Sequence, residues 1–388
     1  MRTLALLLLA LLFFALWPQE PVPVHESPSA ARPTVVVRQS GEADLVGNDE
    51  RTLAAALERL RPNGGTLVVG PGRWVVRRVL FLPKNFVLRG EEGSVLALPA
   101  PALTAAAAEA GACELELAGA HEFADDTRVQ ILPPVGSEFF GDSATKSLEL
   151  QPLARVEGRK LVLAEPLALA LPAGSRVGYP HKLLWVHPEG LATIEDLAFE
   201  GGWVESIPMP GHSQRCAIWA SAPFGFEEQR LGPPGRGVIV RRCRFSDWYG
   251  RGVAFYNHED GVVEDCRFER IHDEAIDLDH FVERFRIARN EVRDVLWGIV
   301  LNDASRNVVE ANQIEGCDIG IWSWQYELTP RQGINEENVI RGNVVKGARQ
   351  NAIRIDKSCV RYVIRDNQVE GSIVVVEADN TVGPNTQL

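Results

Sequence analysis

The sequence has 388 residues, of which 45% are hydrophobic and 24% are charged, a composition ordinary for a globular protein. Its formal net charge is −12, from 52 acidic and 40 basic side chains, and it contains no block of Lys and Arg. Because nucleic-acid binding requires a basic surface, this balance argues against nucleic acid as a partner, although it leaves room for a local basic pair that binds an acidic sugar.

The N-terminus has the pattern of an export signal. Met1 and Arg2 precede an apolar run from Leu4 to Leu16, which is short for a membrane span, and a Pro-rich stretch follows. We therefore interpret residues 1–33 as a signal peptide and linker, and we expect a periplasmic, cell-surface or extracellular protein. A stable membrane span is expected only if this segment stays uncleaved.

The next two regions are interpreted as the start of a solenoid and an insertion. Residues 34–103 contain a short amphipathic helix over 49–60, expected to cap an open core, and then the strands TLVVG, RWVV and FVLRG of the first coils. Residues 104–180 break the rhythm with the candidate strands CELELA, RVQILP, SLELQPL and KLVLAE. We predict a small inserted β module here, and a main parallel β-helix over residues 181–388.

The decisive signal is a repeat of 22–24 residues from Gly237 onward. One strand type carries Cys or Asn at a fixed position, and a second strand type follows each at a nearly constant distance; both ladders lengthen at one coil, which indicates an insertion around Glu327–Asn335. The positions of the first ladder are Cys243, Cys266, Asn290, Asn312, Asn343 and Asn367. Stacked coils bury a continuous core, so the repeat predicts an all-β right-handed parallel β-helix with a buried asparagine ladder. The two ladder cysteines are expected to be buried thiols, and no Cys or His spacing indicates a structural metal.

These features resemble the pectate-lyase-like superfamily of right-handed parallel β-helix proteins. The segment TLAAALERLRPNGGTLVVGPGRWVVRRVLFLPKNFVLRG is similar to its N-terminal cap and first coils, and residues 237–381 are similar to its repeats. The resemblance implies a carbohydrate ligand, because the superfamily contains polysaccharide lyases, glycoside hydrolases, uronan epimerases, esterases and phage adhesins.

Two short strings resemble polygalacturonase motifs: Asp273-Glu274 is similar to a paired-Asp motif, and Arg354-Ile355-Asp356-Lys357 to an Arg-Ile-Lys motif. The sequence departs from that pattern where Tyr249-Gly250-Arg251 and Leu296-Trp297-Gly298 replace the other two motifs.

Alternation along the second strand type predicts which side chains face outward. If the apolar residues such as Val253, Ile276 and Ile299 point inward, three Trp, one Tyr and several polar side chains point outward. Aromatic faces stack on sugar rings and carboxylates bind hydroxyls, so this composition favours a polysaccharide-binding face, unless loops cover it. The candidate binding residues are Trp219, Tyr256, His258, Asn302, Asp303, Trp322, Trp324, Tyr326 and Asp356.

The chemistry of that face is open between three alternatives. In a glycoside hydrolase, Asp277 and Asp279 would serve as general acid and as base or nucleophile, with Asp273 and Glu274 as substitutes. In a uronan lyase or epimerase, Ca²⁺ would be the implied cofactor, and Asp277, Asp279 and Asn302 would bind it or neutralise a uronate. The base that abstracts the proton would then be Arg354, Lys357, His258 or His280. In a non-catalytic glycan-binding or scaffold protein, the aromatic residues alone would act. No other cofactor is indicated.

Overall fold

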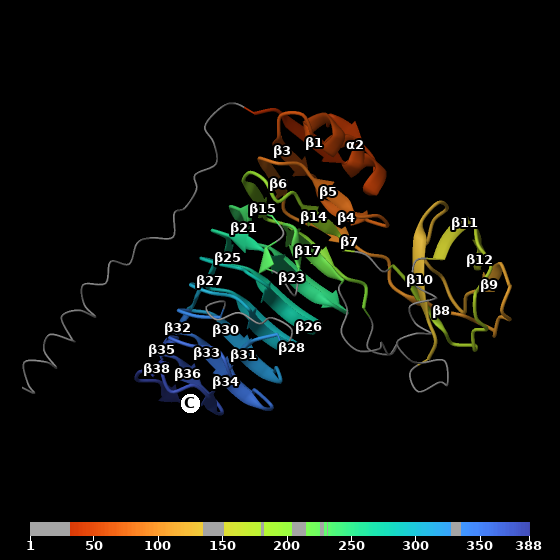
Figure 1. Cartoon of the computed structure of the whole chain (residues 1–388). Helices are drawn as coiled ribbons and strands as arrows, with labels where there is room; N and C mark the ends of the chain where they lie inside the picture. Colours follow the sequence, from red (N-terminus) through yellow and green to blue (C-terminus); the bar gives the residue numbers. More distant parts are fainter. Residues whose placement is uncertain are drawn as a thin grey trace, which may run out of the picture.

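The computed structural model describes residues 32–134, 151–179, 182–203, 215–225, 229–230, 232–326 and 335–388. The interpreted signal segment, apart from Arg32 and Pro33, and most of the expected 327–335 insertion lie outside these residues. Figure 1 shows the described strands stacked coil upon coil in one elongated body, with a separate small sheet at one side.

Two long sheets of parallel strands form the solenoid walls, as the repeat predicts. The first sheet contains the strands with the Cys/Asn ladder at their ends. In spatial order its strands are β2 (Leu45–Val46), β1 (Thr34–Arg38), β3 (Gly65–Val69), β6 (Phe86–Gly90), β15 (Ala192–Glu195), β21 (Val238–Arg241), β25 (Val262–Glu264), β27 (Arg286–Ala288), β29 (Val308–Glu310), β32 (Val339–Arg341), β35 (Val363–Arg365) and β38 (Thr381–Val382).

The second wall bends within each coil and contains 17 strands. Its strands are β4 (Gly72–Val75), β5 (Leu80–Leu82), β7 (Ser94–Ala97), β14 (Leu184–Val186), β16 (Ala198–Glu200), β17 (Cys216–Ser221), β22 (Arg244–Trp248), β23 (Arg251–Tyr256), β26 (Arg267–Asp279), β28 (Glu291–Asn302), β30 (Gln313–Glu315), β31 (Ile319–Trp324), β33 (Val344–Lys346), β34 (Asn351–Ile355), β36 (Gln368–Val369), β37 (Ile373–Val375) and β39 (Thr386–Gln387).

The expected capping helix is α2 (Glu50–Leu60). The Asp49 side chain accepts hydrogen bonds from the backbone N–H groups of Arg51 and Thr52, which stabilises the helix start. Leu53 and Leu60 are fully buried against the first coils, and each contributes about 1.5–3 kcal/mol through burial. In Figure 1 the helix lies over the end of the stack, where it shields the otherwise open core.

The asparagine ladder is confirmed. The Oδ1 of Asn312 accepts from the backbone N–H and the Nδ2 of Asn290, at 3.0 and 2.9 Å, and Asn312 donates through its own Nδ2 to Asn343 Oδ1 at 2.9 Å. Asn367 continues the series. The residue before each Cys or Asn of the ladder has a positive φ, for example Arg289 at 55°. The chain therefore makes the same tight corner in each coil.

The interior is a continuous apolar core. Cys243 and Cys266 are buried free thiols, as predicted. The rings of Phe199, Phe245 and Phe268 stack in register on consecutive coils, with centroid separations of 4.9 and 4.6 Å. Regular stacking therefore extends from backbone hydrogen bonds to side chains.

Between β7 and β14 the chain leaves the solenoid and forms a six-stranded antiparallel sheet with its own apolar core, which includes Leu115, Val129 and Leu161. Its strands, in spatial order, are β8 (Ala102–Leu103), β13 (Arg176–Gly178), β10 (Arg128–Leu132), β11 (Gln151–Glu157), β12 (Lys160–Leu163) and β9 (Glu114–Glu116). Residues 147–150 of the candidate strand SLELQPL lie outside the described part. Two two-stranded ribbons complete the fold: β18 (Phe224–Gly225) with β19 (Gln229–Arg230), and β20 (Gly235–Arg236) with β24 (His258–Glu259).

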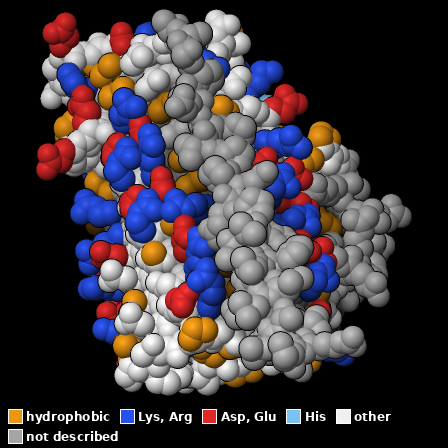
Figure 2. Space-filling model, turned by 90° about the vertical axis from the view of Figure 1, so that its left-hand side faces the viewer, with side chains coloured by type: hydrophobic (Ala, Val, Ile, Leu, Met, Phe, Trp, Pro, Cys, Tyr) orange, Lys and Arg blue, Asp and Glu red, His pale blue; other side chains and the backbone are white. Residues whose placement is uncertain are grey.

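The outer face of the first sheet is covered by ion pairs. Glu195 accepts from Arg89 at 2.6 Å and from Arg241 at 2.7 Å, and Glu310 similarly pairs with Arg286 and Arg341. Figure 2 shows this side as mixed rows of basic and acidic side chains. Glu195 is itself buried beneath these arginines, whose partly exposed charge keeps the face soluble. Within the described residues, no helix is long and apolar enough to cross a membrane.

Candidate active site on the second sheet

The register of the second sheet confirms the predicted inward and outward alternation. Across β23, β26 and β28, Val253 is aligned with Ile276 and Ile299, and all three lie in the core. The outward side chains form two rows along the stack. One row contains Trp219, Ala254, Asp277, Val300, Trp322 and Arg354; the other contains Ser221, Tyr256, Asp279, Asn302 and Trp324.

The expectation that these side chains line an open face is wrong at the centre of the sheet. Asp277 is 1% exposed and Asp279 5%. The Tyr256 ring is stacked between Trp219, at a centroid distance of 4.3 Å, and Phe224 of β18, at 5.1 Å. The ribbon that carries Phe224 covers this part of the sheet. Removing the outward aromatic rings from water in this way stabilises the fold.

Beneath this cover lies an acidic cluster built around Arg251. Its Nε donates to Glu274 Oε2 at 2.8 Å and lies 3.2 Å from Asp277 Oδ2, while its Nη1 donates to the Tyr256 hydroxyl at 2.6 Å. All four side chains are buried. One guanidinium thus holds two carboxyl groups and a phenol in a site closed to bulk water.

A second part of the cluster centres on His280. Its Nε2 lies 3.3 Å from Asp279 Oδ1, and its Nδ1 lies 3.0 Å from Asp303 Oδ2. Asn302 donates through Nδ2 to Asp279 Oδ1 at 2.6 Å. Asp303 also accepts from the backbone N–H of Tyr326, at 3.1 Å. The sequence-predicted residues Asp279, His280, Asn302 and Asp303 are therefore in direct contact.

The two central aspartates differ in the groups that shift their pKa values. Burial raises the pKa of Asp277 well above its usual range, and the neighbouring Asp279 and Glu274 charges raise it further against the pull of Arg251. Burial also raises the pKa of Asp279, but the proximity of His280 and Arg251 opposes it. Burial raises the pKa of Glu274 to about 7, although Arg251 stabilises its charged form. Asp273, which is also buried, adds to the rise at Glu274.

Towards the C-terminal coils the face remains partly open. Trp322 and Trp324 are half-buried, and their rings stack at 5.6 Å. Trp322 Nε1 donates to Asp356 Oδ2 at 2.8 Å, and Arg354 Nε donates to Asp356 Oδ1 at the same distance. Tyr326 contacts both Trp324 and His280 edge-on, at 6.2 and 5.3 Å. The predicted aromatic residues thus form a strip that ends at the acidic cluster.

Three predicted site residues are not brought to the carboxyl cluster. Arg354 lies three strands from Asp277 in the sheet, about 14 Å at the usual strand spacing, and its carboxylate partner is Asp356. Lys357 follows the same strand and is exposed. His258 is buried under Gly235 and edge-on to Phe285, and burial lowers its pKa to about 4, so it is neutral at physiological pH.

Sequence reasoning missed Arg251, Glu274 as its ion-pair partner, and Phe224. Arg251 has the parity of the inward residues Val253 and Phe255, and Glu274 has that of Ile276, so alternation places both in the core. The pairing of β26 with β28 is irregular between Ile271 and Glu274, and this irregularity breaks the alternation. An unpaired charge is too costly to bury in an apolar core, and that rule alone could have indicated that Arg251 faces the aspartates.

The site does not fit the Ca²⁺ ion that a lyase or epimerase would use. Among the described residues, no group of three or more His, Cys, Asp and Glu side chains is arranged to hold a metal ion. In the carboxyl cluster the position a cation would take is filled by Arg251, whose Nε lies between Glu274 and Asp277.

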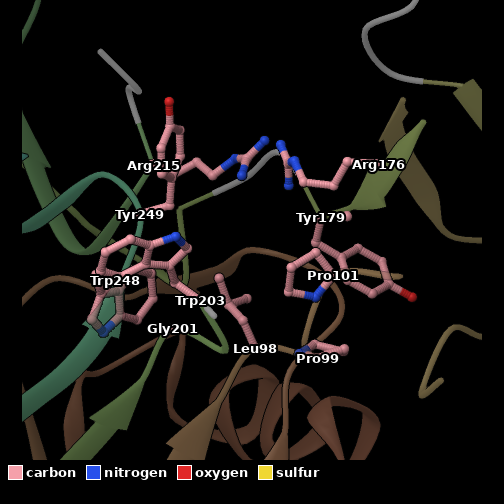
Figure 3. Close-up of a pocket in the computed structure, with 11 residues that line it drawn as sticks. Leu98, Pro99, Pro101, Arg176, Tyr179, Gly201, Trp203, Arg215, Trp248 and Tyr249 are labelled. Carbon is pink, nitrogen blue, oxygen red and sulfur yellow. The ribbon is translucent and has the colours of Figure 1, made fainter. Parts of the chain in front are cut away.

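A separate hollow lies where the inserted sheet meets the solenoid (Figure 3). It borders the part of β26 that precedes Asp277, because His272 of this strand stacks on Tyr249 at 4.8 Å and contacts Trp203 at 5.3 Å. The lining residues are Leu98, Pro99, Pro101, Arg176, Gly178, Tyr179, Gly201, Trp203, Arg215, Trp248 and Tyr249.

The fold defines the protein as a right-handed parallel β-helix. Residues 234–386 match the family model described as right handed beta helix region, which confirms the resemblance inferred from the repeats. No curated protein matches the chain.

Several solved structures have a similar fold at low sequence identity. A structure of XylC in complex with xylose is 10% identical with a TM-score of 0.46, over 92% of this chain and 70% of that one. A GH136 lacto-N-biosidase from Eubacterium ramulus is 12% identical with a TM-score of 0.49, over 91% of this chain and 59% of that one. An exopolygalacturonase from Thermotoga maritima is 12% identical with a TM-score of 0.42, over 87% and 88%. At these identities the likeness concerns the fold alone.

Proposed function

We propose that the protein is an exported, carbohydrate-active β-helix enzyme that hydrolyses a glycosidic bond with Asp277 as general acid. The observation that supports this most directly is the charge imbalance of the buried cluster. Glu274 and Asp277 share a single guanidinium and Asp279 lies nearby, so full ionisation would leave uncompensated negative charge in a water-poor site. The cluster therefore keeps a proton at neutral pH, as a general acid requires.

Asp277 and Asp279 have the two environments that acid–base hydrolysis uses. Among the carboxyl groups of the cluster, Asp277 is the one whose protonated form burial favours most. Asp279 receives the Asn302 amide at 2.6 Å and lies beside His280, and both contacts favour its charged form. In this assignment Asp277 protonates the leaving oxygen, while Asp279 acts as nucleophile or activates water.

Substrate must reach these carboxyl groups past Phe224. Its ring lies on Tyr256 and, at 5.5 Å, on His280, so it occupies the approach to the cluster. We propose that a sugar ring displaces Phe224 and takes over its stacking position. Further sugar units of the same polysaccharide would then bind on the open side, at Trp322, Trp324 and Tyr326.

The test is hydrolysis of a panel of neutral and uronate polysaccharides by the wild type, Asp277→Asn and Asp279→Asn. We expect new reducing ends from the wild type and a loss of about 10²–10⁴-fold in either variant. Asp265→Asn is the control, because Asp265 lies on the surface and pairs with Arg289. Activity that survives both site substitutions, or that yields unsaturated uronate instead, contradicts the proposal.

A second candidate function is glycan binding without cleavage, which the half-exposed stack of Trp322 and Trp324 favours. In that case the protein is retarded in a gel that contains its polysaccharide, Trp324→Ala abolishes the retardation, and no reducing ends form. Among the contacts of the described residues, none favours a lyase or epimerase over these two functions.

A further inference from the structure

The hollow between the inserted sheet and the solenoid contains a buried basic group whose charge is not balanced. Arg176, on β13 of the inserted sheet, is only 3% exposed, and its Nε and Nη2 atoms are buried without a hydrogen-bond partner. A guanidinium has five N–H donors and remains charged in proteins. Burying two of its nitrogens without an acceptor is unfavourable, so these donors point to an acceptor group that the hollow would bind.

A second arginine faces the same space. Arg215, just before β17 of the solenoid, is also buried, and Figure 3 shows its guanidinium pointing toward that of Arg176 across the hollow. Both guanidiniums lie near the ring of Tyr249, with Cζ at 5.9 Å from its centroid for Arg176 and 5.6 Å for Arg215. Burial and the charge of Arg215 both lower the pKa of Arg176. Two like charges brought this close repel each other, and an anion bound between them would reduce the repulsion.

The other walls of the hollow are partly aromatic. Trp203 and Tyr249 provide aromatic surface, and both contact His272, which precedes Asp273 and Glu274 on β26. A ligand held by the arginines would therefore lie directly beside the acidic cluster.

We propose that Arg176 and Arg215 form a binding site for one oxyanion group, a carboxylate, sulfate or phosphate, carried by an acidic saccharide. Two guanidinium forks match the planar or tetrahedral oxygens of such a group, and the aromatic walls contact the ring that bears it. The inference that a saccharide carries the oxyanion rests on the proposed function, whereas the binding of an oxyanion does not. Because one arginine belongs to the inserted sheet and the other to the solenoid, the ligand also joins the two units.

The experiment measures the Tm of the purified protein in sodium sulfate, sodium phosphate, sodium galacturonate and galactose, against sodium chloride at matched ionic strength. The variants are Arg176→Met, which keeps the volume but removes the charge, and Arg155→Met, an arginine of the same inserted sheet that is 62% exposed. We expect at least one oxyanion to raise the Tm of the wild type and Arg155→Met by about 3 °C, as binding near 100-fold above Kd would. We expect no such rise in Arg176→Met.

A second readout separates binding from a structural role. If Arg176 serves to bind an anion, Arg176→Met is at least as stable as the wild type in chloride. If Arg176 instead stabilises the fold, the variant has a lower Tm in chloride. The proposal is overturned by a lower Tm for Arg176→Met in chloride, by equal responses in all three proteins, or by no response to any oxyanion. A galacturonate response above that of sulfate and phosphate identifies a uronate, and the reverse identifies an ester. The same measurement on Asp277→Asn keeps the two proposals apart, since failed hydrolysis with intact anion binding overturns only the proposed function.

Discussion

The Nε atom of Arg251 lies 2.8 Å from Oε2 of Glu274, and both side chains are buried beneath Tyr256 and Phe224. This pair joins β23 to the irregular part of β26, and Arg251 lies 3.2 Å from Asp277. Its position explains how several carboxyl groups are held in a region with little water.

Replacing Arg251 with Gln leaves the surrounding carboxyl groups without their cation. We expect the free energy of unfolding at pH 7 to fall by about 3–5 kcal/mol, since breaking a buried pair leaves uncompensated charge. Denaturant unfolding measures the change, and the loss should shrink at pH 5, where the carboxyl groups take up protons. Arg267→Gln, at a side chain 45% exposed, should change stability by less than about 0.5 kcal/mol. A loss below 1 kcal/mol for Arg251→Gln would show that the cluster is not buried as described.

The pKa of Glu274 predicts a pH dependence of stability. Because burial raises this pKa from 4.5 to about 7, its protonated form is favoured in the folded state. The stabilisation is fully present below pH 4.5 and is lost as the pH rises through about 7. Glu274→Gln should remove a decline on the order of 3 kcal/mol between these values, measured as the wild-type minus variant difference. Glu315→Gln, at a side chain 60% exposed, should leave the difference flat. A difference that instead grows in favour of the wild type with rising pH would mean that Glu274 is folded in its charged form.

The position of Phe224 predicts how well His280 is protected. Phe224→Ala removes the ring that stacks on His280 and Tyr256, so we expect diethyl pyrocarbonate to modify His280 at least about 10-fold faster, as water and reagent enter. Mass spectrometry of the modified peptide measures the rate, and exposed His187 serves as the internal control with an unchanged rate. Equal rates at His280 in the two proteins would show that other groups shield it.

The asparagine ladder predicts a position-dependent cost. Asn312→Ala removes an amide that bonds two neighbouring rungs and leaves buried donors and acceptors unpaired, so we expect a loss of about 2–4 kcal/mol. Asn385→Ala, at the half-buried end of the same ladder, should cost less than half as much, because water can replace its bonds. Urea unfolding of both variants tests the comparison, and equal losses would contradict the ladder as the source of stability.

Local pattern was sufficient for most of the solenoid. The spacing of Asn290, Asn312 and Asn343 predicts the stacked coils, since identical turns in register are the only way to place each amide above the next. The alternation of Val253, Ile276 and Ile299 with polar residues predicts which side of the second sheet faces the core. Both inferences use short-range periodicity, which the strand geometry imposes directly.

The sequence by itself therefore determined the architecture, the capping helix and the outward direction of Asp277 and Asp279. Only the tertiary structure decided that these aspartates are buried under Phe224, that Arg251 pairs with Glu274, and that Arg176 and Arg215 meet across the hollow. The physical reason is that periodicity specifies how a chain repeats along its own axis. Which residues are covered, which charges pair and where hollows form depend instead on how ribbons and the inserted sheet fold back onto the solenoid. The residues that meet there are far apart in sequence, and no periodic pattern relates them.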